Sequence, residues 1–235
     1  MRLPTILAGC VVLFLSISPV RAESVPVPVP VSLQYLLDGA TITSGDKVFS
    51  GFHDFTTSST GSAPTVLAAQ IGVTPTFDNG EYGLVFSTAV FGVSSGQSQD
   101  VAFHFLVRPA PGFLITDNTL EMGAAHVSGP GVIRVIEDAY LPGMPGNPGI
   151  LLAHKMTEWS QNSHIDSVHT VYSQPASLVE VHKHVSLVGG DGGSAGFSDF
   201  NQTFSQTVIP EPVTMLGLLL SVGGVAGYIR RRRMA

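Results

Sequence analysis

Residues 101–108 read Val-Ala-Phe-His-Phe-Leu-Val-Arg, and residues 179–187 read Val-Glu-Val-His-Lys-His-Val-Ser-Leu. In both stretches apolar and polar residues alternate with a period of two, the pattern of a β-strand that buries one face and exposes the other. In the second stretch Lys183 interrupts the apolar face, while His182 and His184 lie on the opposite face. We therefore expect two half-buried strands, one of which presents a pair of histidines.

Similar short stretches recur along the chain, separated by turns rich in Gly, Asn, Asp and Pro. They are residues 47–55, 66–73, 83–86, 114–120, 132–137, 150–156, 168–172 and 197–204. Only residues 32–37 look helical, and His164 and His169 fall in a polar stretch that we interpret as a loop. About ten short strands without interleaved helices predict an all-β fold, a single antiparallel β-sandwich or jelly roll over residues 33–208.

The composition divides the chain of 235 residues into two apolar ends and an acidic body. Five of the eleven basic residues and sixteen of the seventeen acidic ones lie in residues 23–209, which leaves that part a net charge of −11. So acidic a body argues against a nucleic-acid partner. The only cysteine, Cys10, precedes the body, which excludes internal disulfides, a CxxC redox site, a cysteine nucleophile and a Cys-based zinc finger there.

The N-terminus has the three parts of a secretory signal: basic Arg2, an apolar run over residues 3–17, and small residues before a cut that we place after Ala22. Signal peptidase is therefore an expected partner for residues 1–22. The alternative is a lipobox ending at Cys10, which would leave a signal of only nine residues. Residues 25–31 alternate Val and Pro, which predicts an extended leader over residues 23–32, because each proline fixes φ and removes a backbone donor.

The C-terminus, residues 209–235, carries three features in order. Residues 213–229 contain no charge and would span about 25 Å as a helix, close to the thickness of a bilayer core. A basic cluster after the helix should stay cytoplasmic, so that residues 23–209 face outward. The sorting motif before the helix is Pro210, Glu211 and Pro212, and the cluster after it is Arg230, Arg231, Arg232 and Arg233.

This order closely resembles the PEP-CTERM sorting signal of exopolysaccharide-producing Gram-negative bacteria, a tail also named the ice-binding protein C-terminal domain. The resemblance implies an exosortase partner that recognises residues 210–212 and removes the tail. It also implies a membrane helix at residues 213–229 and a stop-transfer role for residues 230–233. The protein would cross the inner membrane, stay anchored transiently, and then reach the cell surface or the medium.

The body carries no recognisable catalytic motif: the GxSxG elbow, the HExxH helix and the P-loop lysine are missing from its sequence. Glu137 and Asp138 are acidic, but neighbours on a strand point to opposite faces, which weakens them as a glycosidase pair. We therefore expect a protein that is not an enzyme.

His182 and His184 share a strand face with Glu180 and are weak candidates for a metal site, against the simpler interpretation of a solvated face. No third partner can be identified from the sequence, so we assign no cofactor and no metal. Calcium through Asp191 or through Asp78 and Asn79 is the alternative.

Together these features predict an exported, non-catalytic surface or extracellular-matrix protein, sorted through an exosortase and associated with exopolysaccharide or biofilm. Three alternatives remain open: a carbohydrate-active enzyme of the envelope, a permanently anchored single-pass membrane protein, and a ligand-binding adhesin.

Processing of the tail can be tested directly. We expect the mature protein from a native host to lack residues 230–233, because removal of the tail separates them from the body. Mass spectrometry of the secreted fraction checks this, and a C-terminal peptide that still contains Arg233 would contradict it.

Overall fold

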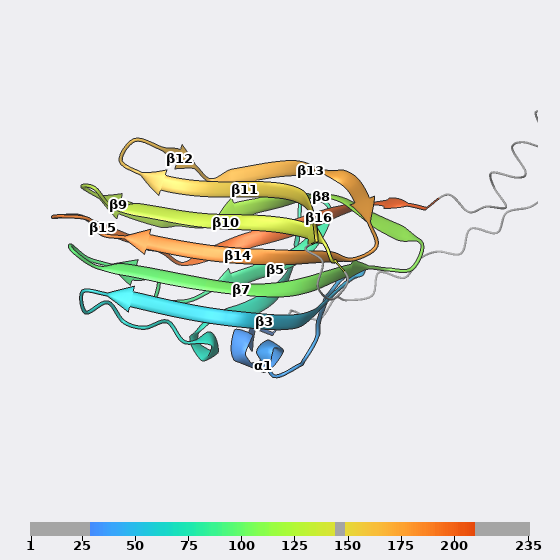
Figure 1. Ribbon diagram of the computed structural model, residues 1–235, viewed down its shortest axis with the longest axis horizontal. Coiled ribbons are helices and arrows are strands. Elements are labelled where there is room, and N and C mark those ends of the chain that lie inside the picture. The colour runs from blue at the N-terminus through green and yellow to red at the C-terminus, as the bar shows by residue number, and fades with distance from the viewer. Residues whose placement is uncertain (1–28, 144–148, 210–235) are drawn as a thin grey trace, which may run out of the picture.

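The computed structural model describes residues 29–143 and 149–209, which form a sandwich of two large antiparallel sheets with a small third sheet at one end (Figure 1). The predicted all-β, antiparallel sandwich is therefore confirmed. In the view of Figure 1 the seven-stranded sheet lies in front of the six-stranded sheet.

The seven-stranded sheet has the order β12-β11-β10-β14-β7-β3-β2, and all its neighbours are antiparallel. Its central strands β7 and β14 contain the two alternating stretches that predicted the fold. In sheet order the strands are β12 (His164–Ile165), β11 (Ile150–Ser160), β10 (Val132–Leu141), β14 (Val179–Val188), β7 (Ser98–Pro109), β3 (Lys47–Thr60) and β2 (Ile42–Ser44).

The six-stranded sheet has the order β1-β4-β5-β16-β8-β13. These strands are β1 (Val31–Ser32), β4 (Gly72–Asp78), β5 (Glu81–Ser87), β16 (Asp199–Val208), β8 (Phe113–Met122) and β13 (Ser167–Ala176). The small sheet consists of β6 (Gly92–Val93), β15 (Ser194–Phe197) and β9 (Ala125–Ser128). The expected short helix is α1 (Leu33–Leu37), whose first turn is capped by the Ser32 hydroxyl accepting from the Tyr35 amide.

Four local predictions differ from the structure. Residues 197–204 are not one strand, because β15 ends at Phe197 in the small sheet and β16 begins at Asp199 in the six-stranded sheet. Residues 66–73 are not one strand, because the 3₁₀ turn η1 (Ala68–Gln70) precedes β4; the Leu67 amide donates to the Gln70 side chain and closes this turn. His164 and His169 lie in β12 and β13 rather than in a loop, because β11 and β8 offer them edges to pair with. For His169 the expected strand over residues 168–172 was the correct prediction. The sheet also begins at Val31, inside the predicted leader.

Phenylalanine side chains fill a large part of the space between the sheets. The Phe86 ring stacks on Phe200 with centroids 5.0 Å apart, and Phe49 contacts Phe105 and Phe204 at 6.1 and 5.8 Å. All five are buried, and aromatic side chains of this size bury more apolar area than any other residue class. This cluster supplies the hydrophobic core that the alternating strands require.

A row of charged side chains lies in the same interior. Lys155 on β11, Glu137 on β10 and Lys183 on β14 are direct cross-strand partners, and all three are buried. Lys155 Nζ lies 2.9 Å from Glu137 Oε1, and Lys183 Nζ pairs with Glu137 Oε2. The interruption that Lys183 makes in the apolar face is therefore real, and a carboxylate on the next strand compensates it.

The predicted opposition of Glu137 and Asp138 is confirmed. Glu137 points into the core, whereas Asp138 lies on the outer face and accepts from His154 Nδ1 at 2.6 Å. The two carboxylates therefore do not face a common substrate, as a glycosidase pair would have to do.

The apolar termini lie outside the described residues. Within the part of the chain that the structure describes, no helix is long and apolar enough to cross a membrane. The signal peptide, the tail motif at 210–212, the segment 213–229 and the arginine cluster 230–233 remain predictions from the sequence.

Substitution of Glu137 tests the buried charge row. We expect Glu137→Gln to lower the free energy of unfolding by about 3 to 5 kcal/mol, because it removes the only carboxylate of a buried ion cluster. Urea denaturation measures the change. The matched control is Asp138→Asn on the outer face of the same strand, expected to cost less than about 1 kcal/mol. Equal effects of the two substitutions would contradict this assignment.

Acid should also destabilise the sandwich through Glu137. Burial alone would raise the pKa of this carboxyl, but Lys155 and Lys183 outweigh burial and lower it from 4.5 to about 2. Because the pKa is lower in the folded state, the stabilisation is complete above pH 4.5 and is lost as the pH falls toward 2. Urea midpoints recorded across that window should fall more steeply in the wild type than in Glu137→Gln, and parallel curves would exclude this role.

Candidate functional site

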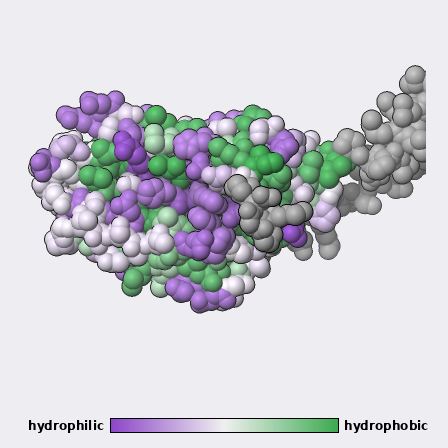
Figure 2. All heavy atoms as spheres, in the orientation of Figure 1, coloured by the Kyte–Doolittle hydropathy of each residue, from purple (hydrophilic) through white to green (hydrophobic). Residues whose placement is uncertain are grey.

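Histidines from four strands and an aspartate from a fifth form a row across the outer face of the seven-stranded sheet. His53 on β3 pairs with His104 on β7, which pairs with His182 on β14; Asp138 on β10 and His154 on β11 continue the row. These residues share one face because side chains directly opposite each other in a sheet point the same way. Figure 2 shows hydrophilic residues gathered over the middle of this sheet.

An irregularity in β3 brings two of these groups into place. The pairing of β3 with β7 shifts between Ser50 and His53 and again between His53 and Thr56. At the bulge Gly51 has φ 59° and Asp54 has φ 54°, so both adopt the left-handed conformation. A bulge changes the direction of the side chains that follow it, and such bulges are common beside functional sites. Here His53 and Asp54 both reach the neighbouring imidazole of His104.

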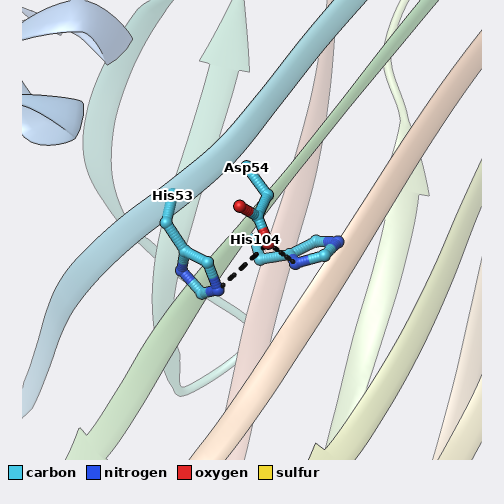
Figure 3. Close-up of side chains that lie close together, drawn as sticks. All are labelled: His53, Asp54 and His104. Atoms are coloured by element: carbon cyan, nitrogen blue, oxygen red, sulfur yellow. Dashed lines mark ion pairs between the residues drawn. The ribbon is translucent and has the colours of Figure 1, made fainter.

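The first group of possible metal ligands consists of His53, Asp54 and His104 (Figure 3). Asp54 Oδ2 lies 3.4 Å from His104 Nδ1 and 3.7 Å from His53 Nε2. The carboxylate therefore sits between two imidazoles from adjacent strands. The group is open to solvent, because the Asp54 side chain is 68% exposed and that of His53 is 42% exposed.

The second group consists of His104, Glu180 and His182. Glu180 Oε1 lies 3.2 Å from His182 Nε2 and 3.5 Å from His53 Nε2, so it also links the two groups. The rings of His104 and His182 stack with centroids 3.7 Å apart. Within each group, one ligand atom per residue lies within 4.8 Å of the others, and His104 belongs to both groups.

The electrostatics favour an uncharged imidazole at the centre of the cluster. Partial burial lowers the pKa of His104, and the neighbouring His182 and His53 lower it further, while Asp54 and Glu180 act in the opposite direction. A neutral imidazole offers a free lone pair to a metal ion, whereas an imidazolium does not. The lowered pKa of His104 therefore favours the neutral form, which can serve as a ligand.

The two histidines singled out from the sequence have different surroundings. His182 is part of the cluster, together with Glu180 as expected, but His184 Nε2 instead contacts Asp100 Oδ1 at 3.2 Å. His184 and Asp100 line a shallow depression of about 130 Å³ together with Thr56. The missing third partners are supplied by β3 and β7. The visible signals for them were His104 on the polar face of its strand and the adjacent pair His53 and Asp54.

The remaining sequence candidates lie elsewhere. Asp78 accepts from the Asn79 side chain at 3.1 Å in the turn between β4 and β5, and Asp191 is exposed. Among the described residues, neither acid belongs to a group of three or more ligand side chains. Ala22 and the sorting residues of the tail lie outside the described part of the chain.

No family model and no curated protein matches the chain. Among solved structures, the chain is similar to TmCBM61, solved in complex with β-1,4-galactotriose, with 13% identity, a TM-score of 0.27, and coverage of 63% of this chain and 86% of that one. It is also similar to the enzymatically active domain of tailspike protein 4 from bacteriophage CBA120, with 13% identity, a TM-score of 0.23, and coverage of 66% of this chain and 19% of that one. Neither similarity assigns a ligand or an activity to this protein.

Proposed function

We propose that this is an exported, non-catalytic surface or extracellular-matrix protein whose outer sheet face binds a divalent transition-metal ion. The observation that carries the metal-binding function is the convergence of three imidazoles and two carboxylates, from β3, β7 and β14, around His104. The cellular setting rests on the two ends of the sequence.

The sequence of the ends supports export and sorting. A signal peptide cleaved after Ala22 would direct the body outward, and the tail at 209–235 resembles a PEP-CTERM signal. We propose accordingly that an exosortase removes the tail at the inner membrane of a Gram-negative bacterium. Exopolysaccharide is the matrix in which the released protein would act.

The donor atoms favour a transition metal over calcium. Each group offers two imidazole nitrogens and one carboxylate oxygen, a set that suits Zn²⁺ and related ions, whereas Ca²⁺ prefers six to eight oxygen ligands. Three protein ligands leave a coordination position for water or for a group on a partner. The open sheet face supports binding rather than catalysis, because catalytic metal sites generally lie in shaped cavities that exclude bulk water.

Zinc titration by calorimetry tests the site in the mature secreted protein. We expect the wild type to bind one zinc ion in the micromolar range or tighter, and His104→Ala to weaken binding by about tenfold or more, because it removes the ligand common to both groups. His169→Ala is the matched control: His169 is an exposed histidine on the other large sheet, paired with Asp117 at 3.1 Å. The zinc affinity of the His169→Ala variant should equal that of the wild type.

Two outcomes would overturn the metal-binding function. One is the absence of any heat with micromolar zinc, nickel or copper. The other is an equal loss of affinity in His104→Ala and His169→Ala, which would indicate scattered binding by surface histidines.

A further inference from the structure

Three buried side chains between the sheets have the arrangement of a reactive group rather than of a simple ion pair. Lys155 Nζ on β11 contacts the carboxamide oxygen of Asn118 on β8 and lies 3.2 Å from its backbone oxygen. The carboxamide nitrogen of Asn118 donates to Glu137 Oε1, which lies 2.9 Å from Lys155 Nζ. A nucleophile, an electrophile and a carboxylate are therefore in mutual contact.

We propose that Lys155 and Asn118 join in an intramolecular amide bond, which forms within the folded protein without the help of an enzyme and with Glu137 transferring the protons. The bond would connect β11 of the seven-stranded sheet to β8 of the six-stranded sheet. It would thus fasten the two layers of the sandwich covalently through their core.

The reaction balances without a further reactant. Uncharged Lys155 Nζ attacks Asn118 Cγ, and the new C–N bond gives a tetrahedral intermediate. Glu137 accepts a proton from the attacking nitrogen and passes it to the carboxamide nitrogen, whose bond to Cγ then breaks. Starting from the lysine ammonium, the sum is ammonium plus carboxamide giving a secondary amide plus NH₄⁺. No electron transfer occurs, and the carboxylate is regenerated.

The charges of the cluster favour this reaction. Two lysines and one carboxylate, all fully buried, carry a net positive charge among apolar side chains, which is costly because buried ions lose their hydration. Amide formation removes the charge of Lys155 and leaves Glu137 and Lys183 as a one-to-one pair. Burial lowers the pKa of Lys183 to about 8 even though Glu137 opposes the shift, which shows how poorly this interior holds positive charge.

Geometry decides which lysine reacts. Lys183 contacts the other oxygen of Glu137 and lies 5.4 Å from the Phe200 ring, with no carboxamide among its hydrogen-bond partners in the described residues. Of the three lysines, only Lys155 contacts Asn118. Holding two reacting groups in contact replaces an encounter in solution, and burial excludes the water that would compete as a nucleophile.

A covalent link of this kind fits the rest of the chain. The body contains no cysteine, so an exported sandwich cannot be cross-linked by a disulfide. A bond between residues 118 and 155 would close a loop that includes all of β10. Such a closure restricts the unfolded chain in the way that a disulfide does, and reducing agents would not open it.

Intact mass of the purified full chain under denaturing conditions tests the proposal. We expect the wild type to be lighter than its sequence mass by about 17 Da, the mass of the ammonia that leaves when the lysine is acylated by the asparagine side chain. Digestion after unfolding should yield a branched peptide joining Lys155 to Asn118, with no cleavage by trypsin after Lys155. This measurement needs no variant and therefore does not depend on a variant that folds.

Variants separate the roles of the three residues. Lys155→Arg keeps the charge but should abolish the mass loss, as should Asn118→Ala. Glu137→Gln should slow it by on the order of a hundredfold or more, because it removes the proton carrier. Lys183→Arg is the matched control, because Lys183 is a buried lysine of the same row. This variant should show the same mass loss as the wild type.

A folded wild type at its full sequence mass after prolonged incubation would overturn the proposal. So would a loss that persists in Lys155→Arg, which would indicate a succinimide at an asparagine instead of a cross-link. Neither result bears on zinc binding at the outer face, so the two proposals are tested independently.

Discussion

The structure depends on one cross-strand register, the pairing of Lys155, Glu137 and Lys183 across β11, β10 and β14. Buried charges are tolerated only when their partners are present, so this row permits little variation in how the three strands align. A slip of one residue would turn the neighbouring outer row, which includes Asp138 and His182, into the core and expose the lysines. The phenylalanine cluster stabilises the sandwich through the apolar area that it buries. The charge row also specifies how β11, β10 and β14 align.

The same register builds the candidate metal site. Because successive residues on a strand face opposite sides, the row of imidazoles lies one residue away from the charged row, on the other side of the same strands. His182 is next to Lys183, and His154 is next to Lys155. The bulge in β3 then adds His53 and Asp54 to the outer row. One alignment of strands therefore positions both the candidate metal site on the outer face and the proposed reactive group in the core.

The lysines of the chain lie in the interior rather than on the surface. All three lysines of the chain are buried: Lys155 and Lys183 pair with Glu137, and Lys47 pairs with Asp46 at 2.9 Å. The body therefore has few cations to present to solvent among its many carboxylates and histidines. Such a surface attracts metal ions, which agrees with the proposed function on the outer sheet. The absence of cysteine from the sequence of the body is consistent with a cross-link of another chemical kind.

The sequence by itself determined the fold class, because period-two alternation, as in residues 101–108 and 179–187, is a local property of a strand with one buried face. It also determined that His182 and Glu180 share the outer face, that Lys183 belongs to the apolar side, and that Glu137 and Asp138 point apart. Only the tertiary structure decided which residues lie opposite them. His104 reaches His182, and Asn118 reaches Lys155, through pairing and packing of strands far apart in the chain. That pairing is set by the whole core and by the β3 bulge, which local alternation does not encode.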